Sequence, residues 1–95
     1  MQRRERRHKL EMYYDVLRAI QEESQNTEGA KPTRVQYRSN MSYDKLTNYI
    51  VELESKKMIS KSDTLFLTEK GLKYLNEYEK IKDFIQRMGL EYLSE

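Results

Sequence analysis

The sequence contains no cysteine and no tryptophan, and its 95 residues include three glycines, one proline and one histidine. Without cysteine there are no disulfide bonds, no thiolate metal ligands and no thiol nucleophile, which fits a reducing cytoplasm. The lone histidine, His8, has no second histidine or cysteine with which to hold a metal ion. Three glycines form no glycine-rich phosphate loop, and no paired carboxylates mark a cleft. The sequence therefore predicts neither an enzyme nor a bound metal, cofactor or small-molecule ligand.

Long apolar runs are also absent. No stretch approaches the length needed to span a membrane, and the basic start lacks the apolar run of a signal peptide. Hydrophobic residues make up 37% and charged residues 36% of the chain. The core of one small domain must therefore be limited, and at least one helix must be largely solvated. We expect a soluble cytoplasmic protein, mainly helical, with a surface for dimerisation.

The net charge of +2 hides an uneven distribution along the chain. Residues 1–9 carry five basic and one acidic side chain, and residues 31–61 carry seven basic and three acidic, so each segment has a net charge of +4. Residues 10–30 have a net charge of −4 and residues 62–95 one of −2. A surface that faces a polyanion, opposite a neutral or acidic surface, would produce this pattern.

The segment 31–57 has the pattern of a helix-turn-helix. Pro32 suits the first turn of a short helix over residues 33–38, and Ser42 can cap a second helix that begins at Tyr43. An apolar stripe on the second helix is formed by Leu46, Tyr49, Ile50 and Leu53. Such a unit can place its second helix in the major groove of DNA. The alternative is a helical hairpin used only for packing.

Two further elements flank this unit. An N-terminal helix over residues 10–23 is predicted from an apolar face formed by Leu10, Tyr13, Tyr14, Leu17 and Ile20. After the helix-turn-helix, the apolar segments 58–61 and 64–67 around a two-residue polar turn predict a β-hairpin, as in a winged helix. Before the first helix, residues 1–9 form either a basic arm that follows the phosphate backbone or a solvated leader.

The last predicted helix carries a seam of apolar residues. Thr68 can cap this helix, and Leu72 and Leu75 are expected to face the winged domain. The seam has alternating three- and four-residue spacing and consists of Tyr74, Tyr78, Ile81, Ile85, Met88 and Tyr92. A projecting helix cannot cover such a stripe alone, so we expect a second copy of the chain to cover it. The alternative is packing against the first helix of the same chain, and we expect fraying from Gly89 onward.

These residues together resemble the small archaeal winged-helix DNA-binding proteins of the Sulfolobus chromatin type. The residues that carry the resemblance are Thr33-Arg34, Tyr37, Asn40, Ser42-Tyr43, Tyr49-Ile50, Ile59 and Leu67-Thr68-Glu69-Lys70-Gly71. The similarity extends from Leu10 to the C-terminus. It implies a winged helix whose C-terminal helix pairs with its twin as an antiparallel coiled coil. This chain differs in its longer basic N-terminus and in a short last helix that contains Gly89.

The sequence thus predicts a mainly α fold with a small β-hairpin (α+β), in which a winged helix-turn-helix precedes a long C-terminal coiled-coil helix. The expected parts are a basic arm (1–9), a winged-helix domain (10–71) and a dimerisation helix (72–95). We expect a homodimeric regulator or chromatin-associated protein that binds double-stranded DNA at the nucleoid. The alternative is a winged helix that binds another protein instead of DNA.

Candidate DNA contacts can be assigned by role. Lys31, Arg34 and Arg38 would lie along the phosphate backbone. Ser42 and Tyr43, at the start of the second helix, can also meet phosphate. The side chains expected at base edges are those of Lys45, Thr47 and Asn48, and Lys61 in the wing (61–64) would touch phosphates.

Overall fold

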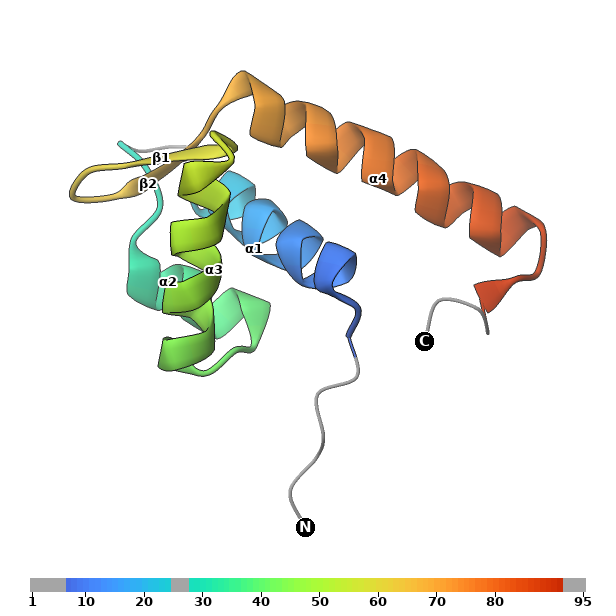
Figure 1. The fold of residues 1–95 in the computed structure, drawn as a ribbon, viewed down its shortest axis with the longest axis horizontal. Helices are drawn as coiled ribbons and strands as arrows, with labels where there is room; N and C mark the ends of the chain where they lie inside the picture. Colours follow the sequence, from blue (N-terminus) through green and yellow to red (C-terminus); the bar gives the residue numbers. More distant parts are fainter. Residues whose placement is uncertain (1–6, 25–27, 92–95) are drawn as a thin grey trace, which may run out of the picture.

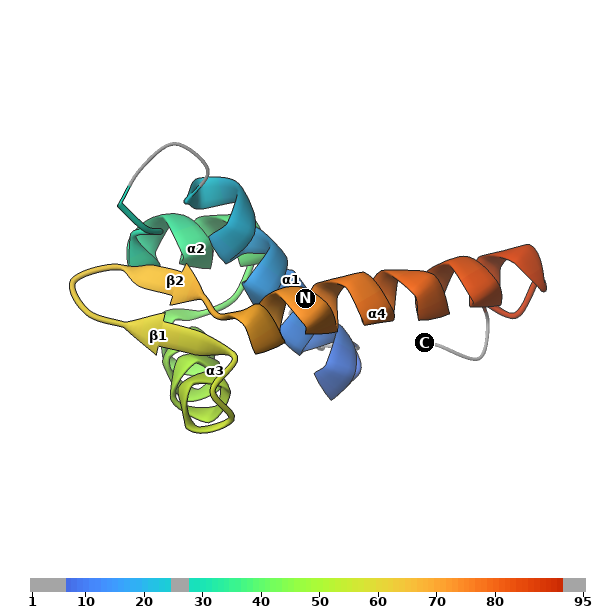
Figure 2. The same cartoon turned by 90° about the horizontal axis from the view of Figure 1, so that it is seen from above.

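The computed structural model of the chain describes residues 7–24 and 28–91, and Figure 1 shows their arrangement. Six elements follow one another: α1 (Lys9–Glu23), α2 (Pro32–Ser39), α3 (Tyr43–Ser55), β1 (Ile59–Lys61), β2 (Leu65–Leu67) and α4 (Glu69–Arg87). This order confirms the predicted mainly helical fold with one small antiparallel hairpin. The hairpin projects at one end of the molecule, and α4 extends past the other helices at the opposite end (Figures 1 and 2).

Helix α1 is the centre of the hydrophobic core. It contacts α2, α3, α4 and β2. Four of the five residues predicted for its apolar face, Tyr13, Tyr14, Leu17 and Ile20, are buried, whereas Leu10 in the first turn is 48% exposed. Because several elements surround α1, a second group of its residues is buried as well: Met12, Val16 and Ala19.

The connection between α2 and α3 follows local sequence signals. Pro32 lies in the first turn of α2, as predicted, although the helix extends one residue beyond the predicted range at each end, and Asn40 caps it in the left-handed conformation with a φ of 58°. Asparagine adopts this conformation more readily than most residues. The Ser42 side chain accepts a hydrogen bond from the Lys45 amide and caps α3, which begins at Tyr43 as predicted. The predicted stripe of α3 faces the core: Leu46, Ile50 and Leu53 are buried and Tyr49 is half-buried.

The wing is the antiparallel pair of β1 and β2. Residues 62–64 connect the two strands, one residue more than predicted, because the Ser62 amide bonds the Thr64 carbonyl and keeps Thr64 in the turn. Ala30 adds an isolated bridge on the other side of β2, where its N–H and C=O both bond Leu65. This bridge ties the segment before α2 to the wing. It was not predicted, since a single residue carries no periodic pattern.

Helix α4 begins as predicted, with the Thr68 side chain capping the Gly71 amide. Leu75 is buried in the core as predicted, but Leu72 is 41% exposed. The core-facing line of α4 passes through Gly71, Leu75 and Tyr78, at spacings of four and three residues, so Leu72 lies to its side. The first half of α4 therefore packs as part of the winged domain.

The end of α4 is a defined stop rather than the predicted frayed end. Gly89 has a φ of 69°, and the Leu90 amide bonds the Ile85 carbonyl at 2.9 Å, as in a Schellman motif. The helix has 19 residues. The structure does not show the predicted long coiled-coil helix, because Met88 is already the C-cap of α4 and Tyr92 lies outside the described residues.

Gly71 is predicted to be essential for the packing of α4 on the start of the hairpin. A Cβ at this position would lie 2.2 Å from the Met58 carbonyl oxygen. We expect Gly71→Ala to lower the free energy of unfolding by about 1–3 kcal/mol, the usual cost of overpacking, although alanine is otherwise preferred in a helix. Asn76→Ala, at an exposed position of α4, should change it by less than about 0.5 kcal/mol in either direction. Equal stability of the two variants in urea unfolding would contradict the prediction.

Candidate nucleic-acid interface

The outer face of α3 is the side opposite the stripe that packs on the core. Thr47 and Asn48 are exposed there, as predicted, and Tyr43 at the start of α3 is 64% exposed. Lys45 was expected on this face, but it lies on the flank that also carries Glu52 and is half-buried. The structure thus brings Tyr43, Thr47 and Asn48 together at the surface and turns Lys45 aside.

Two exposed side chains, one on α3 and one on α2, were not predicted as contacts. Val51 on α3 is 61% exposed, and Tyr37 on α2 is 84% exposed. Helical spacing alone would have found Val51, which follows Thr47 by four residues and Asn48 by three. Tyr37 lines a shallow hollow on α2 and the following turn, together with Thr33, Gln36, Asn40 and Met41.

Glu52 does not lie on the outer face of α3. Its carboxylate accepts a hydrogen bond from the Tyr13 hydroxyl, and Oε1 lies 3.1 Å from the Lys9 ammonium. These two hydrogen bonds lower the pKa of Glu52, whereas burial, followed by the bond to Glu52, raises the pKa of Tyr13. Asp44 and Glu54 are the α3 carboxylates that remain exposed.

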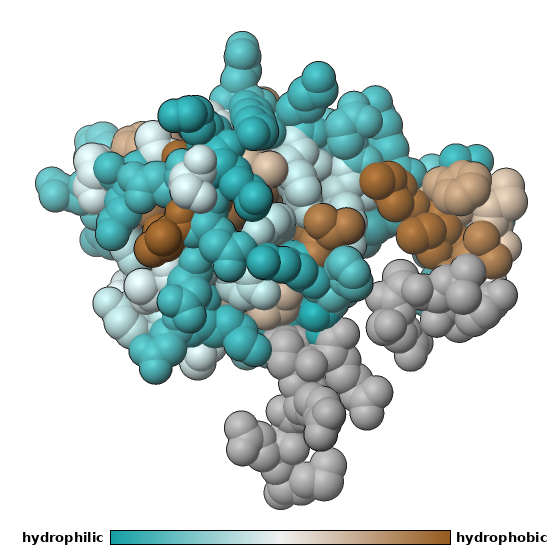
Figure 3. Space-filling view, in the orientation of Figure 1, coloured by the Kyte–Doolittle hydropathy of each residue, from teal (hydrophilic) through white to brown (hydrophobic). Residues whose placement is uncertain are grey.

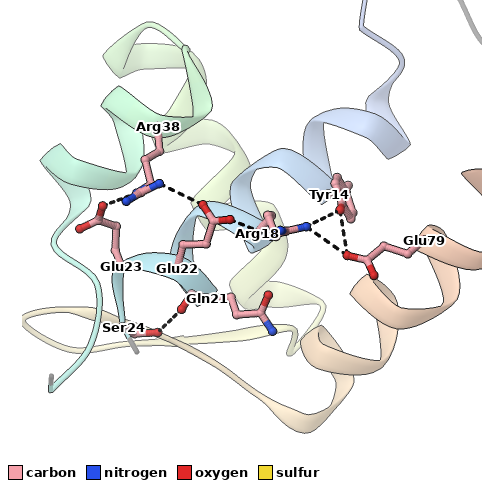
Figure 4. Close-up of polar contacts among 8 residues, drawn as sticks. All are labelled: Tyr14, Arg18, Gln21, Glu22, Glu23, Ser24, Arg38 and Glu79. Carbon is pink, nitrogen blue, oxygen red and sulfur yellow. Dashed lines mark hydrogen bonds and ion pairs between the residues drawn. The ribbon is translucent and has the colours of Figure 1, made fainter. Parts of the chain in front are cut away.

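The two arginines of α2 pair with the acidic end of α1. Arg38 Nη1 lies 3.0 Å from Glu22 Oε1, and Arg38 Nε donates to the Glu23 carboxylate (Figure 4). Arg34 Nε lies 3.3 Å from Glu23 Oε1. A phosphate group would have to compete with these carboxylates for both arginines. Arg34 and Arg38, predicted as phosphate contacts, therefore belong to an intramolecular ion-pair cluster.

The ion-pair cluster continues across α1 to α4. Glu22 Oε2 lies 3.0 Å from Arg18 Nε, and Arg18 Nη1 lies 3.2 Å from Glu79 Oε2 (Figure 4). The Tyr14 hydroxyl accepts from Arg18 and donates to Glu79. The Lys82 ammonium lies 4.5 Å from the centre of the Tyr14 ring. Polar contacts thus connect α2 with α4 by way of α1.

Lys31 and Lys61, which were also predicted as phosphate contacts, are not held in ion pairs within the described part of the chain. Both side chains are exposed. Lys31 precedes the first turn of α2, and Lys61 is the last residue of β1. Lys57, just past α3, is also exposed. These lysines border the helix-turn-helix and the wing.

Arg7, from the predicted basic arm, is bound to the folded domain. Its guanidinium lies 2.7 Å from Asp15 Oδ2, and it donates to the carbonyls of Ser39 and Asn40 at the end of α2. A cation at a helix C-terminus is favourable because carbonyl groups there lack helical partners. Arg7 therefore anchors the turn of the helix-turn-helix. Residues 1–6 of the predicted arm lie outside the described residues.

The predicted dimer seam of α4 divides into two parts. Tyr74 and Tyr78 are half-buried against α1 of the same chain: the rings of Tyr13 and Tyr74 lie 6.2 Å apart, and those of Tyr14 and Tyr78 lie 5.2 Å apart. The Tyr74 hydroxyl donates to the Leu10 carbonyl. For these two tyrosines, the structure shows the alternative packing within the chain.

The distal part of α4 leaves its apolar side chains uncovered. Ile81 is 52% exposed, Met88 is 55% exposed and Ile85 is half-buried. Phe84, which was not predicted for the seam, is 49% exposed. Figure 3 shows apolar residues gathered over this end of the helix. We refer to Ile81, Phe84, Ile85 and Met88 as the distal patch.

Other kinds of site find no support in the described part of the chain. Residues 7–24 and 28–91 contain no group of three or more histidine, aspartate or glutamate side chains that could hold a metal ion. None of the helices described there is both long and apolar enough to cross a membrane.

Acid should weaken the ion-pair cluster. The hydrogen bond from Arg38, assisted by Arg34, lowers the pKa of Glu23 from its ordinary value of 4.5. A carboxylate whose pKa is lowered by folding stabilises the fold above its unfolded pKa, and this contribution is lost as the pH falls through the folded pKa. We expect Glu23→Gln to reduce the free energy of unfolding most above about pH 6, and the difference from wild type to shrink toward about pH 3.

Urea unfolding across this pH range measures that difference. Glu54→Gln is the matched control, because Glu54 is exposed and forms no ion pair with a described residue. A destabilisation by Glu23→Gln that stays constant with pH would show that its ionisation is not linked to folding.

Comparison with known proteins agrees with this geometry. A protein-family model described as winged helix-turn-helix matches residues 6–86. No curated protein sequence matches the chain.

Proposed function

The chain belongs to the winged helix-turn-helix family, and from this we propose that it is a DNA-binding regulator that acts at the nucleoid. The observation that carries the proposal is the outer face of α3. The opposite side of α3 packs on the core. Tyr43, Thr47 and Asn48 are exposed on the outer face, where such folds meet the major groove. Lys31, just before α2, and Lys61, at the end of β1, are exposed cations available to the phosphate backbone.

A second function is favoured by the hollow on α2. Its lining carries no charged side chain, and Tyr37 is almost fully exposed within it. Tyrosine is enriched at protein–protein interfaces. A winged helix that binds another protein through α2 is therefore the alternative to DNA binding.

The ion-pair cluster determines which cations we assign to the phosphates. Binding of a phosphate by Arg38 would compete with its pairs to Glu22 and Glu23, and binding by Arg34 would compete with its pair to Glu23, which offsets part of the gain. Lys31 and Lys61 have no such partner among the described residues. We therefore assign the main phosphate contacts to these lysines, and a smaller part to the arginines.

Salt dependence separates the two groups of cations. The logarithm of the affinity should fall with the logarithm of the salt concentration by about 0.9 for each neutralised phosphate. Lys31→Ala and Lys61→Ala should each reduce this slope by about one per contact removed, and Arg34→Ala should reduce it less. Replacing both Glu22 and Glu23 with glutamine should increase the slope, because it releases the arginines.

Fluorescence anisotropy with a labelled duplex over about 50–200 mM salt measures these slopes. An affinity that does not change with salt, or no binding to any duplex, would refute DNA binding. Binding of a protein partner that Tyr37→Ala abolishes would then support the alternative.

We further propose that the distal patch holds two copies of the chain together. Ile81, Phe84, Ile85 and Met88 follow one another at spacings of three, one and three residues, which places them on one side of α4. Burying a large apolar side chain is worth about 1.5–3 kcal/mol, and about half of this is unrealised at three of the four residues. Antiparallel pairing of two α4 helices would cover the patch and give two linked DNA sites.

Replacing both Ile81 and Ile85 with aspartate should give a monomer, because four like charges would meet in the interface. DNA affinity should fall with it, since two linked sites become one. Sedimentation equilibrium at tens of micromolar protein measures the mass. Asn76→Asp with Gln86→Asp adds the same charge at exposed polar positions of α4 and should leave a dimer. A wild-type mass near 11.6 kDa would refute the dimer.

A further inference from the structure

The outer face of α3 carries no cation among its exposed residues. Thr47, Asn48 and Val51 lie at its centre, and Asp44 and Glu54 lie beside them. Arginine and lysine are the side chains that pair with O6 and N7 of guanine in the major groove. Both guanine atoms are acceptors, so a carboxylate that meets them repels them. This face therefore lacks a reader for guanine.

The centre of the face presents groups that match an A·T pair. Val51 exposes 61% of its surface on a helix whose other large aliphatic side chains are buried. The Thr47 hydroxyl donates to the Tyr43 carbonyl at 2.8 Å, so its proton is not available to a base. Asn48 forms no side-chain hydrogen bond with a described residue. A free amide can pair with N6 and N7 of adenine, and an exposed apolar side chain can pack on the thymine methyl group.

We propose that α3 selects A·T base pairs, with Val51 packed on the 5-methyl group of thymine and Asn48 paired with adenine. Because the two residues are three apart, one turn of α3 presents both at adjacent points of the groove. This inference rests on the proposed DNA binding and adds the class of sequence that is bound. In this inference, A·T pairs are distinguished from G·C pairs by an apolar contact and an uncharged amide rather than by a charged side chain.

The test removes the methyl group from the DNA and its partner from the protein. Duplexes are first selected from a random pool by the wild-type chain and then remade with uracil in place of thymine, which deletes only the 5-methyl group. Affinities of wild type, Val51→Ala and Asn48→Ala are measured for both forms by anisotropy. Val51 is mostly exposed, so Val51→Ala should fold, and urea unfolding checks this.

For wild type we expect selected sites rich in A·T pairs and an affinity loss of about fourfold for each buried methyl group removed. Val51→Ala should bind the thymine and uracil duplexes equally, whereas Asn48→Ala should bind both forms more weakly than wild type and keep the uracil effect. Equal binding of both duplexes by wild type, an unchanged uracil effect in Val51→Ala, or selected sites rich in G·C pairs would overturn the inference while DNA binding stands. Absence of binding to every duplex would overturn DNA binding itself.

Discussion

Burial of α1 is the constraint on which the other elements depend. A helix of 15 residues has seven buried residues on adjoining faces, so α2, α3, α4 and the hairpin must all be in place around it. α2, α3 and the hairpin are short, and each buries apolar residues in the core around α1. The orientation of α3 toward solvent is therefore a result of packing on a helix that itself contacts no DNA in our proposal.

Charge is arranged around the same helix. The sequence places a net charge of +4 on residues 31–61 and −4 on residues 10–30, and folding brings parts of the two segments together through Arg38 and Glu22. Exposed ion pairs of this kind add about 0–1 kcal/mol to stability. These ion pairs also reduce the positive potential of the surface, because the paired arginines present little net charge to an approaching polyanion. Fewer basic side chains of residues 31–61 are therefore available to DNA than their net charge of +4 indicates.

Local signals explain which parts of the fold could be predicted from the sequence. Pro32, Ser42 and Thr68 act on backbone groups within a few residues, so they set the starts of α2, α3 and α4 correctly. The pairing of Arg38 with Glu22 and Glu23 of α1 depends on how the two helices cross, and the spacing of residues along the sequence does not predict this angle. The same holds for α4, where periodicity identified an apolar stripe but could not say that its first half would meet α1.

The packing of Leu75 and the bond from Tyr14 to Glu79 bear on how this protein can be recombined. The division predicted from the sequence falls at residue 72, between a winged-helix domain (10–71) and a dimerisation helix (72–95). The core, however, extends into the third turn of α4, so a graft made at that junction would remove part of the hydrophobic interior along with the appendage. A junction beyond Lys82, whose ammonium lies 4.5 Å from the centre of the Tyr14 ring, would leave these contacts with the domain.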